Sequence, residues 1–200
     1  VVTQEEHFKF AQEIYDTIES SALLRGTGIA KRTPEYIQKK MSNGDAMIAL
    51  ADGKFAGFCY IESWQHGKFV AHSGLIVHPD YRSLGLAKKI KSKVFDYSLQ
   101  RYPDAKIFGI TTGLAVMKIN SDLGYKPVPF SELTTDPSFW AGCKTCTNYQ
   151  ILQSKENKMC LCTGMLYDPK EKQKIPPKHP FNEKVLNRLR TIKQALFLKK

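Results

Sequence analysis

The run Arg82-Ser83-Leu84-Gly85-Leu86-Ala87 has the residue types of an anion-binding loop at the start of a helix. Residues 69–77 before it are β-branched and aliphatic, which predicts a buried strand, and residues 86–97 carry apolar side chains at helical spacing. Gly85 and Ala87 keep bulky side chains away from the first helical turn, where unpaired amides and the helix dipole attract a negative charge. Arg82 adds a donor for a charged hydrogen bond. The run matches neither the G-x-G-x-x-G dinucleotide motif nor a P-loop, so we expect a phosphate loop of another kind.

This stretch resembles the acetyl-CoA signature of the GCN5-related N-acetyltransferase (GNAT) superfamily. Arg82-x-x-Gly85-x-Ala87 follows a strand that ends in Val77-His78-Pro79-Asp80-Tyr81. The resemblance implies that the loop amides bind the pyrophosphate of acetyl-CoA or another acyl-CoA, and that the strand backbone pairs with the pantetheine arm. The residues assigned to the donor on this basis are Leu75, Ile76, Val77, Arg82, Ser83, Leu84, Gly85, Leu86 and Ala87.

Three further segments resemble the acetyltransferase domain of bacterial N-acetylglutamate synthases. They are Lys31-Arg32-Thr33-x-Glu35, Ile110-Thr111-Thr112 and Leu123-Gly124-Tyr125-Lys126-Pro127-Val128. The resemblance implies acylation of a small amino acid, most simply glutamate as in arginine biosynthesis, with Lys31, Arg32, Thr111 and Thr112 at the acceptor site. The chemistry agrees, because a dicarboxylic substrate needs cations and Lys31 and Arg32 precede a helix. The alternative is that both are solvated charges in front of a helix cap.

Two positions depart from the patterns of these relatives. Gly113 stands where the synthases have an arginine, so one acceptor contact is missing. The tyrosine that often serves as the acid in the family falls near Ile119 and Asn120, so no tyrosine is present there to protonate the thiolate. We expect Asn120 to hydrogen-bond CoA instead.

Attack of an amine on a thioester requires a base, and the developing oxyanion requires amide donors. Amides of the strand at Leu75 to Val77 are the expected donors. The candidate bases are His72, Glu62 on the neighbouring strand, and a water with no dominant side chain. Period-two alternation places His72 on the same face as Gly74 and Ile76.

Four cysteines follow, as Cys143-x-x-Cys146 and Cys160-x-Cys162. Residues 147–152 and 159–167 read as two strands of a β-hairpin, which would bring the two pairs together. A Cys₄ set with such spacings suits a structural zinc ion. However, a C-x-C on a strand directs its sulfurs to opposite faces, so the alternative is reduced cysteines packed as small apolar residues.

The order of the predicted elements is that of an α/β (α+β) GNAT fold. We expect a mixed central sheet flanked by helices, with an extra Cys-bearing β-hairpin and a C-terminal helix. Residues 1–168 form the predicted acyltransferase domain, in which 131–168 are the hairpin extension, and 169–200 form a basic, Pro-containing linker and amphipathic helix. The expected helices are 8–18, one from Thr33, 86–97 and 114–123, and the expected strands are 46–51, 55–64, 69–77, 106–111 and 125–130.

The formal net charge of +11 is concentrated near the end of the chain. Residues 170–200 contain ten Lys or Arg against Glu171 and Glu183, so the rest is only mildly basic. We expect this tail to dock on the same body or in a homodimer, with RNA or an anionic surface as the alternative. Apolar runs shorter than the ~18 residues of a membrane span and the absence of a signal-peptide pattern predict a cytoplasmic protein with no membrane partner.

The sequence therefore predicts an enzyme that transfers an acetyl or succinyl group from acyl-CoA to a small amino-acid acceptor. One alternative is acetylation of a protein, a polyamine or an aminoacyl-tRNA. A second alternative, from another class, is a non-catalytic module that binds nucleic acid through the cysteine hairpin and the tail. CoA affinity and salt-dependent retention on RNA distinguish these alternatives.

Overall fold

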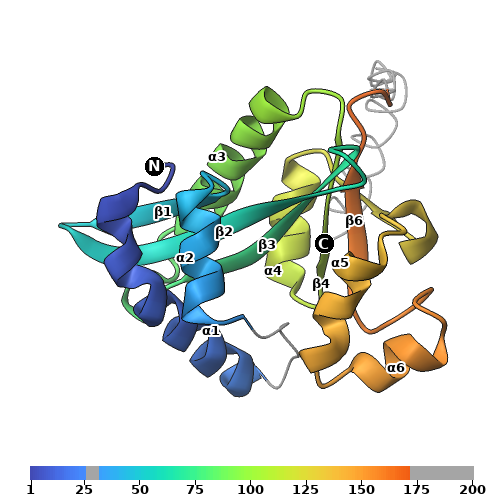
Figure 1. Ribbon diagram of the computed structural model, residues 1–200, viewed down its shortest axis with the longest axis horizontal. Helices are drawn as coiled ribbons and strands as arrows, with labels where there is room; N and C mark the ends of the chain where they lie inside the picture. The colour runs from blue at the N-terminus through green and yellow to red at the C-terminus, as the bar shows by residue number, and fades with distance from the viewer. Residues whose placement is uncertain (26–31, 172–200) are drawn as a thin grey trace, which may run out of the picture. The chain divides into compact units, whose positions relative to one another are not determined.

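The computed structural model describes residues 1–25 and 32–171, and its centre is a six-stranded sheet in the order β1-β2-β3-β4-β6-β5 (Figure 1). The pairs β1–β2, β2–β3, β4–β6 and β5–β6 are antiparallel, whereas β3–β4 is parallel. The sheet is therefore mixed, as predicted. Its strands are β1 (Ala46–Ala51), β2 (Lys54–Trp64), β3 (Phe69–Val77), β4 (Lys106–Thr111), β5 (Lys126–Val128) and β6 (Thr163–Tyr167).

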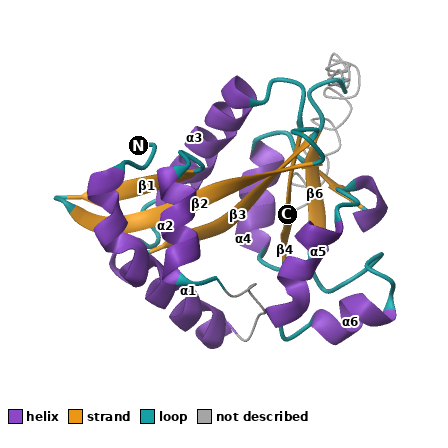
Figure 2. Cartoon of the chain, in the orientation of Figure 1, coloured by secondary structure: helices purple, strands orange, loops and turns teal. Residues whose placement is uncertain are grey.

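Helices cover both faces of this sheet (Figure 2). Apolar side chains of α1 and α2 pack with Phe58, Tyr60 and Ile76 on one face. On the other face, Ile90 and Val94 of α3 pack against β2 and β3. The α-helices are α1 (Ala11–Arg25), α2 (Pro34–Ser42), α3 (Leu86–Arg101), α4 (Leu114–Asp122), α5 (Pro137–Ala141) and α6 (Tyr149–Ser154), and the 3-10 helices are η1 (Glu5–Phe10), η2 (Pro79–Tyr81), η3 (Phe130–Glu132) and η4 (Gly142–Thr145).

Local signals account for the ends of several elements. Thr33 caps α2, because its Oγ1 accepts a hydrogen bond from the Tyr36 amide at 3.2 Å, and Pro34 occupies the first turn. Asp52 and Gly53 both have positive φ, which is the geometry of the tight turn that connects β1 and β2. These signals are present in the sequence. The predicted strand at 46–51 and the predicted helix start at Thr33 are confirmed.

The predicted cysteine hairpin is wrong. Residues 147–152, expected as its first strand, contain most of helix α6. Tyr149 and Leu152 are three residues apart, so both pack into the same apolar cluster with Phe108 and Leu166. The expected second strand begins only at Thr163 and lies between β4 and β5 as a central strand of the sheet. Residues 131–168 therefore include part of the core sheet.

The chain divides at Pro169 into two units, residues 1–169 and 170–200. The basic helix predicted near the end of the chain lies outside the described residues. Within the described part, we find no helix with the length and apolar character that a membrane crossing would require.

Candidate active site

A cavity of about 490 Å³ opens where β3 and β4 separate. The two strands pair only between Phe69–Ala71 and 106–108, and β3 then continues to Val77 without β4 beside it. Figure 1 shows the strands diverging from the end at which they pair. Residues of β2, β3, β4, α3, α4 and the segment 139–162 contribute to the cavity wall. A parallel pair that separates in this way leaves strand backbone available to a ligand.

A β-bulge in β3 forms part of this wall. Ser73 pairs with Tyr60 and Ile76 pairs with Phe58, so Gly74 and Leu75 together face the single residue between Phe58 and Tyr60. Gly74 has φ +63°, and a Cβ there would lie 2.4 Å from Tyr60 Cε1. Only glycine satisfies both conditions. Because a bulge removes residues from the ladder, it leaves amides near Gly74 free to face the cavity.

The bulge also overturns the predicted orientation of His72. Strict alternation would place His72 on the same face as Ile76, but the extra residue shifts the pattern. His72 contacts Ser98 of α3, whereas Ile76 packs with α1 and α2 on the opposite face. Leu75 and Val77, expected opposite His72, pack on its side of the sheet.

His72 is 8% exposed, and both of its ring nitrogens have partners. The Ser98 hydroxyl donates to the Val94 carbonyl at 2.8 Å, so Ser98 Oγ must accept from His72 Nε2, 2.9 Å away. His72 Nδ1 then accepts from the Tyr125 hydroxyl at 3.1 Å. Burial and the nearby Lys91 ammonium lower the pKa of His72 well below its usual value. This neutral imidazole has no nitrogen left for a substrate proton.

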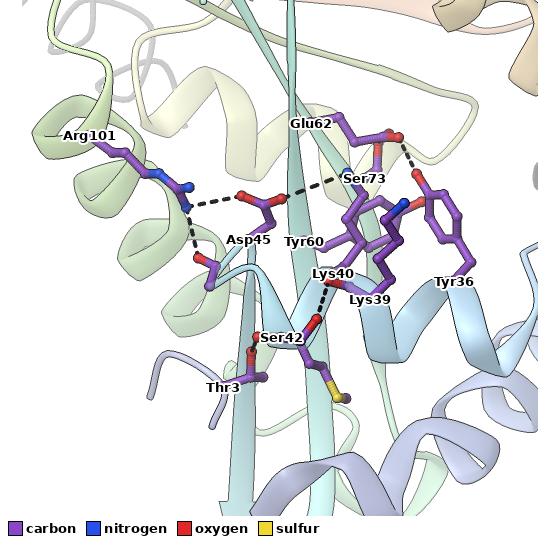
Figure 3. Close-up of polar contacts among 12 residues, drawn as sticks. Thr3, Tyr36, Lys39, Lys40, Ser42, Asp45, Tyr60, Glu62, Ser73 and Arg101 are labelled. Atoms are coloured by element: carbon purple, nitrogen blue, oxygen red, sulfur yellow. Dashed lines mark hydrogen bonds and ion pairs between the residues drawn. The ribbon is translucent and has the colours of Figure 1, made fainter. Parts of the chain in front are cut away.

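Glu62 lies on the other side of the sheet, beside α2. Its carboxylate accepts hydrogen bonds from the Tyr36 hydroxyl and, at 3.0 Å, from the Ser73 hydroxyl. Figure 3 shows Glu62 and Tyr36 pointing toward one another. Burial and the Glu62 carboxylate raise the pKa of Tyr36, so its phenol stays protonated and remains a donor. Glu62 is thus a buried carboxylate held in one position at the cavity wall.

Arg32 reaches the cavity from the start of α2. Its Nε donates to the Tyr60 hydroxyl at 3.1 Å, and its guanidinium lies over the Tyr36 ring. Although burial lowers the pKa of Arg32, Tyr60 and Glu62 raise it on balance. Thr111 and Thr112, also predicted at the acceptor site, line the same cavity. Lys31, the remaining predicted acceptor residue, lies outside the described residues.

The predicted phosphate loop precedes α3. Gly85 is the N-cap in the left-handed conformation, with φ +72°, and no side-chain cap covers the first amides of the helix. Arg82 donates to the Val77 carbonyl at 3.2 Å and to the Ser21 hydroxyl at 2.8 Å, so it also holds α1 against the end of β3. Val77 and residues 82–87 do not line the cavity, whereas Leu75, Ile76 and Asn120 do.

The cysteines lie close together, but not in the predicted hairpin. Burial and neighbouring thiols raise the pKa of Cys143 to about 11 and that of Cys162 to about 12, and both side chains line the cavity. In residues 1–25 and 32–171, no three His, Cys, Asp or Glu side chains are arranged to hold a metal ion. The grouping that the predicted zinc site of Cys143, Cys146, Cys160 and Cys162 requires is therefore not found among these residues; Cys143 lies on η4 and Cys146 at its end.

Sequence reasoning missed several polar residues of the cavity and its surroundings. Tyr36 and Tyr60 were given no role, and Tyr125 was named only as part of a motif. Lys91 carried a clearer signal. Its spacing of three, four and seven residues to Val94, Phe95 and Ser98 places it on the buried face of α3. A lysine on a buried helical face is rare enough to mark a site.

Solved structures with a similar fold include the following three. The N-acetylglutamate synthase of Neisseria gonorrhoeae, solved with coenzyme A and N-acetyl-glutamate, aligns with a TM-score of 0.61 at 13% identity, over 84% of this chain and 34% of that chain. Rv2747 of Mycobacterium tuberculosis, solved with CoA, aligns with a TM-score of 0.60 at 12% identity, over 84% of this chain and 97% of that chain. A GNAT acetyltransferase of Staphylococcus aureus aligns with a TM-score of 0.55 at 17% identity, over 68% of this chain and 88% of that chain. This chain spans about a third of the gonococcal synthase.

No curated protein sequence matches this chain significantly. The family model for GNAT acetyltransferases matches residues 12–114, which contain α1, α2, β1 to β4, the bulge, Glu62 and the phosphate loop. The order of these elements agrees with the predicted mixed sheet. The chain belongs to the acetyltransferase (GNAT) family and is an acyl-CoA-dependent N-acyltransferase.

Proposed function

We propose that this enzyme acylates the amino group of glutamate. The observation that carries the proposal is the Arg32 guanidinium at the cavity wall beside Tyr60. A planar guanidinium binds carboxylates through paired hydrogen bonds, and a dicarboxylic amino acid needs such partners once water is excluded. The gonococcal synthase, of similar fold, was solved with N-acetyl-glutamate. The reaction would be the glutamate acylation that the sequence resemblance associates with arginine biosynthesis.

We assign the role of base to Glu62, acting directly or through one water. The incoming ammonium must lose a proton before it attacks the thioester. Glu62 is a fixed acceptor on the same side of the sheet as Arg32, whereas both nitrogens of His72 are already engaged. His72 then serves to hold α3 and Tyr125 against β3. Amides near Gly74 would stabilise the oxyanion.

For the donor, the proposed site combines the strand edge and the start of α3. The amides after Gly85 would bind the pyrophosphate, since they lie at the N-terminus of a 16-residue helix without a capping side chain. Asn120 lines the cavity and would bind the thiol end of the pantetheine arm. CoA supplies the activated acyl group, and the chain supplies position and proton acceptors.

An amino-acid panel with acyl-CoA, followed by thiol release, tests the acceptor. We expect Arg32→Gln to lower kcat/KM for glutamate roughly 30- to 150-fold, because a charged hydrogen bond contributes about 2 to 3 kcal/mol. The KM for acyl-CoA should change little. Arg101→Gln is the matched control, since Arg101 does not line this cavity and its guanidinium pairs with the Asp45 carboxylate (Figure 3) and with the Tyr97 hydroxyl.

Two results would contradict the proposal. One is turnover of a peptide, a polyamine or an aminoacyl-tRNA by an enzyme that ignores glutamate. The other is an Arg32→Gln variant that uses glutamate as well as the Arg101→Gln control does.

A further inference from the structure

Lys91 of α3 places a positive charge inside the cavity. The side chain is 2% exposed and contributes to the cavity wall. Its ammonium lies 5.5 Å from the centre of the Tyr125 ring, which gives a cation–π contact. Because Lys91 lies in the second turn of α3, it is separate from the phosphate loop, whose residues do not line this cavity.

The charge of Lys91 has no opposite charge beside it. Throughout the described ranges, no hydrogen bond or ion pair joins its Nζ to another residue. Glu62 lies on the other face of the sheet, with Tyr36 and Ser73. Burial lowers the pKa of Lys91 to about 8, so the side chain is still mostly protonated at neutral pH. A buried ammonium without a partner is costly unless a ligand provides one.

Asn120 of α4 adds a second unsatisfied polar group to the same wall. It is 1% exposed, and its Oδ1 is buried without a hydrogen-bond partner in the part of the chain that the structure describes. An orphaned buried amide oxygen is rare in native proteins. Asn120 and Lys91 therefore mark a polar end of the cavity on the α3 and α4 side, distinct from the Arg32 and Glu62 side.

We propose that Lys91 binds a carboxylate at the free end of the donor's acyl group, so that the preferred donor is a dicarboxylic acyl-CoA of the succinyl-CoA type. This inference rests on the proposed function, in which Arg32 on the opposite face binds the acceptor. Attack of the amine forms the amide C–N bond and breaks the C–S bond. The amine proton leaves to the base, the CoA thiolate takes up a proton, and the terminal carboxylate stays ionised beside Lys91.

Donor selectivity tests the inference. The full chain is assayed with glutamate and either succinyl-CoA or butyryl-CoA, which has the same acyl length without the carboxylate. Acetyl-CoA serves as the short donor. We expect kcat/KM to favour succinyl-CoA over butyryl-CoA about 10- to 100-fold, as one charged hydrogen bond would give. Lys91→Met should remove most of this ratio. Lys88→Met, on the exposed side of α3, should keep it.

Equilibrium binding without an acceptor separates this inference from the proposed function. Calorimetric titration should show tighter binding of succinyl-CoA than of butyryl-CoA, and Lys91→Met should equalise the two. That result supports the inference even if glutamate proves not to be the acceptor. A parent enzyme that prefers acetyl-CoA or butyryl-CoA overturns it, as does a Lys91→Met variant that loses activity equally with all three donors.

Discussion

The two sides of the cavity hold their polar groups differently. On the side of α1 and α2, Glu62 has two hydroxyl donors and Arg32 has a hydroxyl acceptor in Tyr60. On the side of α3 and α4, Lys91 has only an aromatic face, and Asn120 Oδ1 has no partner among the described residues. The first side is organised before a ligand binds, while the second is left incomplete. The difference indicates that the α3 side depends more on its ligand for stabilisation.

The bulge at Gly74 keeps these two sides distinct. Ser73 faces Glu62 and α2, whereas His72, one residue earlier, faces Ser98 and α3. After the bulge the alternation is reversed, so Leu75 packs on the α3 side. Loss of the bulge would exchange the side chains that each half of the cavity receives.

Gly74→Ala should therefore have the largest effect. The new Cβ would overlap the Tyr60 ring at 2.4 Å, and the residue would keep a positive φ. Strain and overpacking together should lower the free energy of unfolding by ~2 to 5 kcal/mol. Urea unfolding measures this change, and turnover should fall as the amides move. Gly53→Ala is the matched control, since Gly53 has φ +76° but no atom within 4 Å of the position that its new Cβ would take.

The control should lose only ~1 to 2 kcal/mol, the cost of the left-handed backbone conformation alone. Equal losses at Gly74 and Gly53 would mean that the close approach to Tyr60 does not constrain β3. The bulge at Gly74 would then not be what keeps the two sides of the cavity distinct.

Lys91→Met should raise stability in the absence of ligand. Burial lowers the pKa of Lys91 from 10.5 to about 8, so keeping it charged at neutral pH costs on the order of 3 kcal/mol. The neutral variant avoids this cost, and its urea midpoint should lie above that of the parent. Lys88→Met, which removes an exposed partner of Asp122, should change stability by less than ~1 kcal/mol.

The advantage of Lys91→Met should disappear at high pH. Between about pH 8 and pH 10.5, the unfolded chain binds a proton at this lysine that the folded chain has released. Parent stability therefore rises with pH through this window relative to the variant. Urea titrations at about pH 7.5 and about pH 10 measure the change. A difference that does not vary with pH would show that the buried charge is not its cause.

Much of the sheet was predictable from the sequence, because its signals are local. The strands at 46–51, 69–77 and 106–111 are apolar runs bounded by turn residues, and their predicted bounds agree with the structure. The segment 147–152 misled because Thr147, Tyr149 and Ile151 alternate as in a strand, whereas Tyr149 and Leu152 are at helical spacing and pack in one cluster with Phe108. The pairing of β6 with β4 and β5 depends on contacts between residues far apart in the sequence, which no local pattern predicts.

The residues of the site were more predictable from the sequence than their arrangement. Arg32 was predicted from the resemblance to N-acetylglutamate synthases and Glu62 as a candidate base on a strand, and both line the cavity. The orientation of His72 was not, because the bulge depends on the contact between Gly74 and Tyr60 across two strands. A glycine inside a strand is itself a signal for a bulge, and it was present in the sequence. The partners of Glu62 required the packing of α2 on β2, which only the tertiary structure supplies.

Tyr36→Phe should have the smallest effect, on the organised side of the cavity. The change removes one of the two hydroxyl donors to Glu62 and leaves the ring that packs beside Tyr60 and Arg32. A hydrogen bond to a charged group contributes about 1.5 to 3 kcal/mol, but Ser73 remains as a donor, so we expect kcat to fall about tenfold at neutral pH. The KM for acyl-CoA should stay unchanged.

A positioning role for Tyr36 makes a prediction that packing alone does not. A carboxylate that has lost a donor is held less firmly in the position from which it takes the proton, so kcat should fall while the KM for glutamate and the KM for acyl-CoA stay unchanged. Tyr15→Phe removes a phenol hydroxyl from the same apolar cluster, on α1 and outside the cavity wall, and should leave kcat unchanged. If Tyr36→Phe has the same kcat as Tyr15→Phe, Glu62 is not the group that takes the proton. The base would then be a water, because both nitrogens of His72 remain bound to Ser98 and Tyr125.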